Sequence, residues 1–322
     1  MSKEGTPMTD IFSHCDDAAL LTKRSGCSVY EFRNETGEGR MTIYDVFPGV
    51  TLAYNDFHMQ YYDSYFHPGR ELLCIDHCRE GRLEYAAKSD AYSYVEAGDL
   101  KLDRRLTHTG RFVLPLSHYH GAMISFDLAA ASRALPQEIR DFPVDVYALQ
   151  EKYCRDKYPL VIHGMDAIEH IFSELYAVPQ KIRLPYFKVK IMELLLYLDA
   201  LELPESIGEK PYFYKAHVEK TKAVRKFLEK HPAESYTQEE LAEHFGISLT
   251  TLKKCFRSIY GTAIGMWLTQ YRMNRAAVLL KTEKDYSVAQ IAGMVGYDSP
   301  SKFSAAFRKA MGMSPAQYRK IF

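Results

Sequence analysis

Two histidines of this 322-residue chain, His118 and His120, stand one residue apart in a strand-like run, so alternation points both rings to one face. Such a pair could ligate a metal ion, but a metal needs more than two protein ligands, and the next acidic residue is Asp127. The sequence therefore predicts no metal and no cofactor. These two histidines, together with His58 and Arg79, are instead predicted to contact a small-molecule effector.

Thiol chemistry is the second possibility that the residue types raise. Cys74 and Cys78 would share one face of a strand, and His77 would point away from it. Two thiols do not complete a structural zinc site, so these are predicted to be buried free cysteines. The sequence also has neither a Gly-x-Ser-x-Gly nucleophile motif nor a phosphate-binding Gly-x4-Gly-Lys-Ser/Thr loop. No catalytic residue is predicted, and the protein is not expected to be an enzyme.

The charged residues are divided unevenly along the chain, although 41 Lys and Arg balance 41 Asp and Glu overall. Residues 216–322 hold 17 basic and 9 acidic side chains, a net charge of +8. The remaining residues hold 24 basic and 32 acidic side chains, a net charge of −8. This asymmetry predicts a basic module that binds a polyanion, joined to a module with a different task.

The basic half contains an internal repeat. One copy runs from Glu240 to Gly261 and the other from Gln290 to Gly312. The matching residues are Leu241-Ala242 with Ile291-Ala292, Gly246 with Gly296, Phe256 with Phe307, and Gly261 with Gly312. Their separation is 50 positions before the central turn and 51 after it. Two aligned copies of one helical motif indicate a duplicated structural unit.

Each copy is predicted to form a helix-turn-helix. Thr237 and Ser287 begin Thr-x-x-Glu and Ser-x-x-Gln capping boxes for a short first helix. Gly246 and Gly296 supply a turn residue that can take a positive φ. The caps expected for the second helices are Ser248 in the first copy and Asp298 or Ser299 in the second.

The second helix of each copy has an apolar stripe and an outward polar face. Leu252 and Phe256 point inward in the first copy, as do Phe303 and Phe307 in the second. The outward residues predicted to contact DNA are Thr250, Lys253, Lys254, Arg257, Ser301, Lys302, Ser304, Arg308 and Lys309.

A long helix, roughly from Thr262 to Lys281, is predicted between the copies. Its apolar residues near one face are Ile264, Trp267, Leu268, Tyr271, Val278 and Leu279. At ~1.5 Å per residue, about eighteen residues hold the copies ~27 Å apart. This is near the ~34 Å that separates successive major grooves on one side of DNA. One chain could therefore insert two recognition helices into adjacent grooves.

The paired copies, the long connecting helix and the ending Gly312-Met313-Ser314-Pro315-x-x-Tyr318-Arg319 resemble the DNA-binding domain of AraC/XylS-type transcription regulators. The resemblance covers about residues 216–322. It implies an effector-responsive regulator, more often an activator than a repressor. The strand-rich and then helical part upstream is similar in layout to the family's cupin-like regulatory domain with dimerisation helices.

The resemblance also implies which recognition helix reads sequence. In the family, the positions matching Thr250, Lys253 and Lys254 reach base edges, where lysine can donate to guanine and threonine can meet a thymine methyl. Ala305 departs from the family pattern, because many members carry a long polar or basic residue there. The second helix is therefore expected mainly to position the protein on phosphates.

The upstream residues predict a different architecture. From about Cys27 to Leu128, β-rich runs are separated by turn signals such as Pro48-Gly49, Glu80-Gly81 and Gly98-Asp99, which is typical of an antiparallel barrel or sandwich. Helices are then predicted over Val144–Cys154, Gly164–Tyr176 and Leu184–Leu203. The last carries an apolar stripe that packs either on its own barrel or on a second copy of the chain.

The expected fold class is α+β. An N-terminal cupin-like antiparallel β-barrel with a C-terminal helical pair precedes an all-α domain of two helix-turn-helix units joined by a long helix. Residues 1–128 are expected to sense the effector, residues 129–203 to form a helical extension for dimerisation, residues 204–215 to form a linker, and residues 216–322 to bind DNA.

The sequence also predicts where the protein works and with what. Residues 1–20 lack the segments of a secretory signal, and no apolar run approaches ~18 residues. A cytoplasmic protein with no membrane partner and six reduced cysteines is expected. The expected partners are double-stranded DNA, an unknown small-molecule effector, RNA polymerase and a second copy of the chain in a homodimer.

One alternative from another functional class stays open. It is a DNA-associated enzyme, in which a thiol- or metal-dependent N-terminal domain is fused to the DNA-binding module. Such an enzyme would need a zinc-binding set of cysteines and an activated thiol. The spacing of Cys15, Cys27, Cys74 and Cys78 does not resemble such a set.

Overall fold

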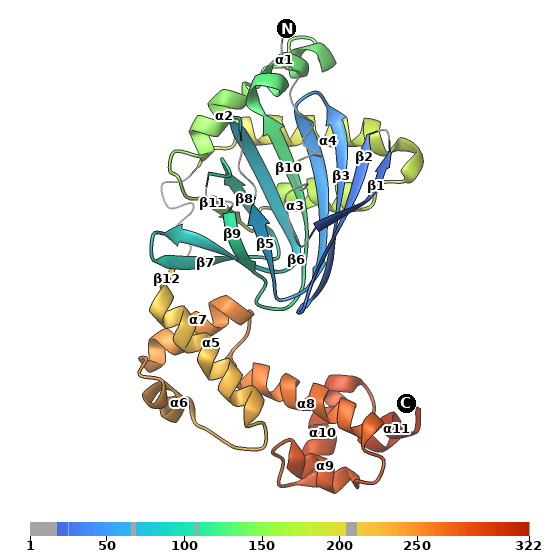
Figure 1. The fold of residues 1–322 in the computed structure, drawn as a ribbon, viewed down its shortest axis with the longest axis vertical. Coiled ribbons are helices and arrows are strands. Elements are labelled where there is room, and N and C mark those ends of the chain that lie inside the picture. The colour runs from blue at the N-terminus through green and yellow to red at the C-terminus, as the bar shows by residue number, and fades with distance from the viewer. Residues whose placement is uncertain (1–17, 25, 66–68, 107–108, 204–210, 322) are drawn as a thin grey trace. The chain divides into compact units, whose positions relative to one another are not determined.

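The computed structural model describes residues 18–24, 26–65, 69–106, 109–203 and 211–321. The chain divides into two compact units, Met1–Tyr212 and Phe213–Phe322, and each is described here by itself (Figure 1). Most of the linker predicted over residues 204–215 lies outside the described residues. Among the residues that are described, no helix is both long and apolar enough to cross a membrane.

The N-terminal unit is built on a large antiparallel sheet. Its strands are β1 (Ala18–Arg24), β2 (Cys27–Asn34), β3 (Gly37–Phe47), β4 (Val50–His58), β6 (Leu72–Lys88), β7 (Ala91–Glu96), β8 (Asp99–Asp103), β10 (Tyr119–Asp127) and β11 (Leu160–His163). They follow the order β1-β2-β3-β4-β10-β6-β7, and β8 pairs with both β6 and β11. Side chains alternate between the two faces along each strand, so each face carries its own core.

A second, two-stranded sheet packs on one face of the main sheet. It consists of β5 (Tyr61–Tyr65) and β9 (Thr109–Val113). Tyr62 of β5 stacks on Phe112 of β9 with ring centroids 5.2 Å apart, and on Phe57 of β4 at 5.0 Å. Main-sheet residues such as Tyr30 and Tyr119 are buried in the same core. These aromatic contacts join the two sheets.

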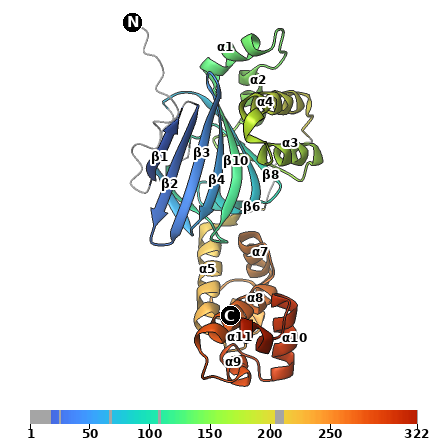
Figure 2. The same ribbon diagram turned by 90° about the vertical axis from the view of Figure 1, so that its right-hand side faces the viewer.

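Helices cover the opposite face of the main sheet (Figure 2). They are α1 (Leu128–Glu138), α2 (Val146–Tyr153), α3 (Asp166–Tyr176) and α4 (Arg183–Ala200). Phe172 of α3 and Phe187 of α4 are fully buried in a core that also contains Leu52 and Ile124 of the sheet. The predicted order of strands followed by helices is confirmed, and the unit is a mixed α+β structure.

One long strand runs where the sequence predicts a turn. Glu80-Gly81 is a turn signal, but β6 continues through both residues. Gly81 has a φ of 91°, and a Cβ there would lie 2.2 Å from the carbonyl oxygen of His118. The glycine bends the strand next to a register shift at His120 instead of ending it. The predicted turn at Glu80-Gly81 was therefore wrong. Strand β11, which lies between α2 and α3, was not predicted.

The stripe on α4 belongs to the core of its own unit. Phe187, Ile191 and Leu195 are all fully buried there. Of the two alternatives for this stripe, packing on its own sheet is confirmed. The outward side of the same segment carries Val189 and Leu196, which are 60% and 44% exposed.

The C-terminal unit is helical. Its helices are α5 (Lys215–Lys230), α6 (Gln238–His244), α7 (Leu249–Tyr260), α8 (Ile264–Thr282), α9 (Val288–Met294), α10 (Pro300–Met311) and α11 (Pro315–Ile321). Helix α8 runs between the group formed by α5, α6 and α7 and the group formed by α9, α10 and α11 (Figure 1). The predicted pair of helix-turn-helix units with a long connecting helix is confirmed.

The apolar face predicted for α8 is partly wrong. Val278 is 59% exposed, whereas Met273 and Leu280 are buried. Each end of α8 packs against a different copy. Trp267 packs edge-on against Phe256 of α7, and Met273 and Leu280 share a core with α9 and α10. A single apolar stripe cannot serve two partners on different sides, so the buried face changes along the helix.

Candidate nucleic-acid interface

In both copies the helix caps and the turn glycine are those that the sequence predicts. The hydroxyls of Thr237 and Ser287 accept hydrogen bonds from the backbone N–H groups three residues on, and the Glu240 and Gln290 side chains complete both capping boxes. Gly246 and Gly296 take φ values of 59° and 80° in the turns. Ser248 caps α7, and Ser299, one of the two predicted candidates, caps α10. These turns fix the direction in which each recognition helix leaves its first helix.

The inner stripes of the recognition helices are confirmed. Leu252 and Phe256 of α7 are fully buried, as are Phe303 and Phe307 of α10. Each helix therefore has one anchored face, and its remaining residues point outward. The predicted DNA-contacting residues Thr250, Lys253, Lys254, Arg257, Ser301, Lys302, Arg308 and Lys309 are exposed, and Ser304 is half-buried. Their contacts with DNA stay a prediction.

One side chain that the sequence did not single out, Arg272 of α8, joins the two copies. Its Nε donates to the carbonyl oxygen of Pro232 and an Nη to that of Glu234, both at 2.8 Å, in the loop before α6. A Cβ at Gly296, in the turn of the second copy, would lie 2.8 Å from Arg272 Nη2 and 2.9 Å from the oxygen of Ala233. The guanidinium therefore lies between the loop of one copy and the turn of the other.

The partial burial of Arg272 has an electrostatic consequence. Burial lowers the pKa of its guanidinium from the ordinary value, and Tyr297 opposes that shift. The group stays charged at neutral pH, so both carbonyl hydrogen bonds are charge-assisted. Nothing in the sequence distinguished Arg272 from other cations, because its role depends on a loop about 40 residues away in the chain.

The spacing of the two copies is set by α8. Its 19 residues rise ~1.5 Å each and so span ~28 Å. Residues near both ends of α8, Ile264 and Leu280, are buried. That the two recognition helices match the ~34 Å repeat of the major groove stays a prediction.

Three of the four predicted effector residues lie near one another in the N-terminal unit. The Nε2 atoms of His58 and His120 are 3.3 Å apart. The ring of His118 lies beside that of His120, with centroids 6.2 Å apart. Arg79 instead lies over the ring of Tyr176, 4.8 Å from its centroid. Their role in effector binding stays a prediction.

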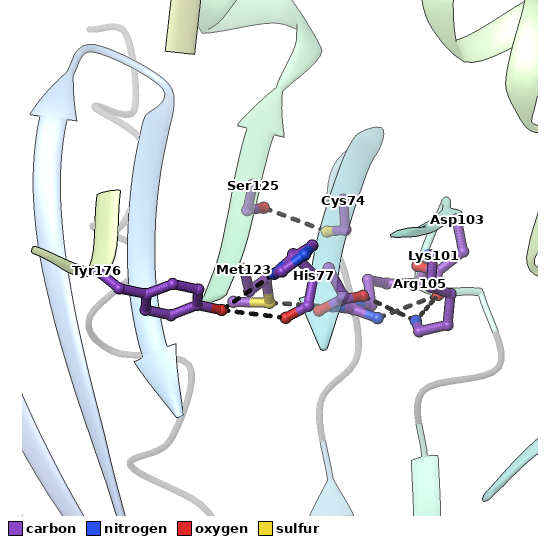
Figure 3. A network of polar contacts seen from close by, with 9 residues as sticks. Cys74, His77, Lys101, Asp103, Arg105, Met123, Ser125 and Tyr176 are labelled. Carbon is purple, nitrogen blue, oxygen red and sulfur yellow. Dashed lines mark hydrogen bonds and ion pairs between the residues drawn. The ribbon is translucent and has the colours of Figure 1, made fainter. Parts of the chain in front are cut away.

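A buried ionic network crosses the main sheet of the N-terminal unit (Figure 3). Arg105 donates to both carboxylate oxygens of Asp76, at 2.6 and 2.8 Å, and to Asp103 at 3.0 Å. Lys101 contacts Asp76 at 2.8 Å and also Asp103. Burial alone would raise the pKa of Asp76, but Arg105 and Lys101 outweigh it and hold that pKa below its ordinary value. The positive charges of Arg105 and Lys101 balance the negative charges of Asp76 and Asp103, so these residues are explained as a structural set of buried ion pairs.

The histidine between the cysteines packs toward the helices. His77 is buried, stacks on Phe172 with centroids 4.3 Å apart, and places Nε2 2.9 Å from Glu169. Burial lowers the pKa of His77, and the hydrogen bond to Glu169 opposes this shift. Cys74 and Cys78 are buried free thiols, as predicted. Burial raises the pKa of Cys74 to about 11, which disfavours the nucleophilic thiolate.

Comparisons with known proteins match the C-terminal unit. A family described as a helix-turn-helix domain matches residues 241–321. The HTH-type transcriptional regulator ExsA of Pseudomonas aeruginosa is 33% identical over 104 residues, which cover 32% of this chain and 36% of that protein. A putative AraC-like transcription regulator of Streptomyces antibioticus is 39% identical over 94 residues, covering 29% of this chain and 31% of that protein.

A third relative also matches this chain over about a third of its own length. The transcriptional activator AggR of Escherichia coli is 35% identical over 99 residues, which cover 31% of this chain and 37% of that protein. The chain thus spans about a third of the length of these curated relatives. The match to the helix-turn-helix family begins within α6 and includes the rest of the first copy, the connecting helix α8 and the whole second copy.

Proposed function

We propose that the protein is a sequence-specific, DNA-binding transcription regulator of the AraC/XylS type, because residues 241–321 match a helix-turn-helix family and the chain's relatives include a putative AraC-like regulator. The observation that carries the proposal is the pair of capped recognition helices held by one connecting helix. Each buries its apolar stripe and leaves polar and basic residues exposed. Two such helices fit adjacent major grooves of double-stranded DNA.

The two recognition helices are proposed to have different tasks. On α7, Lys253 and Lys254 face outward in the middle of the helix, where they can donate to guanine O6 and N7. On α10 the outward cations of the last turns are Arg308 and Lys309, which suit phosphate oxygens. The first helix would then supply most of the sequence preference, and the second would fix position along the duplex.

The N-terminal unit is proposed to be a cupin-like regulatory domain. Two observations support this: antiparallel strands dominate it, and a second small sheet packs over an aromatic core on one face of the main sheet. In this division of labour residues 1–128 sense a small molecule, residues 129–203 support dimerisation and residues 216–322 bind DNA. Effector binding increases DNA binding only if the effector binds the DNA-competent state more tightly than the other state.

Activation through RNA polymerase and homodimer formation are part of the same proposal. The relative AggR is named a transcriptional activator, and this chain is proposed to act in the same direction. The inner stripe of α4 is occupied by its own core, so a dimer would have to use the outer side. Val189 and Leu196 lie there seven residues apart and are each at least 44% exposed.

We do not propose the alternative of a thiol-dependent enzyme, because the buried cysteines of the N-terminal unit are poor nucleophiles. Burial raises the pKa of Cys154 to about 12 and that of Cys74 to about 11, which leaves little thiolate at neutral pH.

Selection of DNA from a random-sequence pool tests the proposed function, with the purified full chain and at a stated salt concentration, because affinity depends steeply on salt. We expect enrichment of two short blocks about one helical turn apart. If no sequence is enriched with or without cell-extract small molecules, sequence-specific regulation is rejected.

A further inference from the structure

Three side chains with metal-ligand chemistry converge on the face of the main sheet that also carries the helices. They are Asp56 and His58 of β4 and His120 of β10, here called the histidine–aspartate cluster. The Nε2 atoms of His58 and His120 lie 2.9 and 3.0 Å from the same oxygen, Asp56 Oδ1. The two Nε2 atoms are 3.3 Å apart. The three atoms therefore form a nearly equilateral triangle.

The sheet itself positions the cluster. Asp56 and His120 are direct register partners on the neighbouring strands β4 and β10. His58 follows Asp56 by two residues and so points to the same face. No loop conformation is needed to bring the three ligand atoms together, and paired backbone holds the two strands in place. This is the preorganisation that a metal site requires.

The dimensions of the triangle suit a transition metal. With each ligand ~2.1 Å from a central ion, ligand atoms are roughly 3.0 Å apart in octahedral and 3.4 Å apart in tetrahedral coordination. Two imidazole nitrogens select first-row transition metals over Mg²⁺ and Ca²⁺, which prefer oxygen ligands alone. We propose that the histidine–aspartate cluster binds one divalent first-row transition-metal ion through His58 Nε2, His120 Nε2 and a carboxylate oxygen of Asp56.

The cluster is open to solvent. Its cross-strand neighbours are Glu38 opposite His58, Arg40 opposite Asp56 and Glu80 opposite His120, and both glutamates lie near an arginine of their own, Arg33 and Arg79. The side chains of Asp56 and His58 are 58% and 61% exposed. The ion would therefore keep open positions for water or a small ligand and would exchange with solution.

A second group of metal-ligand residues shows what distinguishes this cluster. Glu96, Asp99 and His163 also approach one another. There, Asp99 accepts a hydrogen bond from the backbone N–H of Glu96 at 2.7 Å, and Glu96 is paired with Arg82. Those carboxylates serve a turn and an ion pair. In the histidine–aspartate cluster, by contrast, the Nε2 atoms of His58 and His120 both lie next to one carboxylate oxygen of Asp56. These are the atoms that would bind the metal.

Cobalt titration tests the proposal with the untagged full chain after treatment with a chelator. The bound Co²⁺ is counted by equilibrium dialysis, and its visible absorption reports the coordination geometry. We expect one Co²⁺ per chain, displaced by Zn²⁺. His58→Ala and His120→Ala should each weaken binding at least about tenfold, since even residues that only support a metal ligand cost 10–100-fold.

A matched control uses a histidine outside the triangle. His170→Ala removes an exposed imidazole on α3, outside the cluster, and should bind Co²⁺ as the unchanged chain does. Circular dichroism checks that each variant is folded, and Asp56→Asn provides a third, nearly isosteric removal of a ligand. The proposal is overturned if the chain binds no Co²⁺, or if His58→Ala and His120→Ala bind Co²⁺ as tightly as the unchanged chain does. Neither result depends on DNA binding.

Discussion

The first and second helix-turn-helix copies differ on their outward faces while their buried faces coincide. Lys253 and Lys254 of α7 correspond to Ser304 and Ala305 of α10, at the offset of 51 that also pairs Phe256 with Phe307. The first helices differ too. The first turn of α6 carries Glu239 and Glu240, whereas the first turn of α9 has no acidic residue.

This difference separates what packing requires from what a partner requires. Both recognition helices must pack on α8 and on their own first helix, so both need large apolar residues at the same inner positions. The outward positions carry no such constraint. One copy can therefore present lysines to bases while the other presents small residues, provided that the spacing between the helices is kept.

The largest expected effect comes from the turn glycines, whose surroundings differ between the copies. A Cβ at Gly296 would lie 2.9 Å from the backbone oxygen of Ala233, whereas one at Gly246 would meet only Lys220 Nζ, at 3.5 Å. Both have positive φ, so Gly246→Ala should cost about 1–3 kcal/mol of unfolding free energy. Gly296→Ala should cost clearly more. Denaturant unfolding of the full chain measures both, and equal costs would contradict the close approach.

The next largest effect concerns the middle of α7. We expect Lys254→Glu to weaken DNA binding about 10- to 100-fold and to change the preferred sequence, because a good base contact discriminates by about 1–3 kcal/mol. Binding to a library of single-base variants of the selected site measures both. Lys226→Glu on α5 is the control for charge alone. Unchanged affinity and preference would reject Lys254 as a base contact.

A smaller and different effect is expected on α10. Lys309→Glu should weaken binding to all sequences about equally, because a phosphate contact carries no sequence information. It should also reduce the slope of log affinity against log salt by about one. The same library and a salt series give both numbers. A changed sequence preference would mean that α10 reads bases, and the contrast between the copies would fail.

The smallest effects should be equal in the two copies. Thr237→Ala and Ser287→Ala each remove a capping-box hydroxyl and should each cost about 1 kcal/mol of unfolding free energy. Thr237→Ser, which keeps the hydroxyl, should cost much less. Thermal unfolding compares the three variants. A large difference between the first two would show that the copies are not energetically equivalent.

Local signals were sufficient to predict the C-terminal unit. Capping boxes, turn glycines and apolar stripes act within a few residues, so Thr237, Gly246 and Phe256 could each be assigned from neighbours in the sequence. The connecting helix α8 was harder. Its two ends pack against different elements, which a search for one continuous stripe at helical spacing does not find.

Long-range pairing limited the prediction of the N-terminal unit. The strands β4 and β10 lie side by side although His58 and His120 are 62 residues apart. A local pattern therefore paired His120 with His118 and missed Asp56. Gly81 shows the same limitation, because only the closeness of β10 reveals that it bends a strand instead of ending one.

The spacing of the two blocks in a selected DNA site tests the central claim most directly. Inserting five base pairs between the blocks turns the second block to the opposite side of the duplex, and α8 is too short and too firmly packed to follow it. We predict that affinity falls to that of a site with the first block alone. Unchanged affinity after the insertion would contradict an account in which one chain holds two recognition helices at a fixed separation.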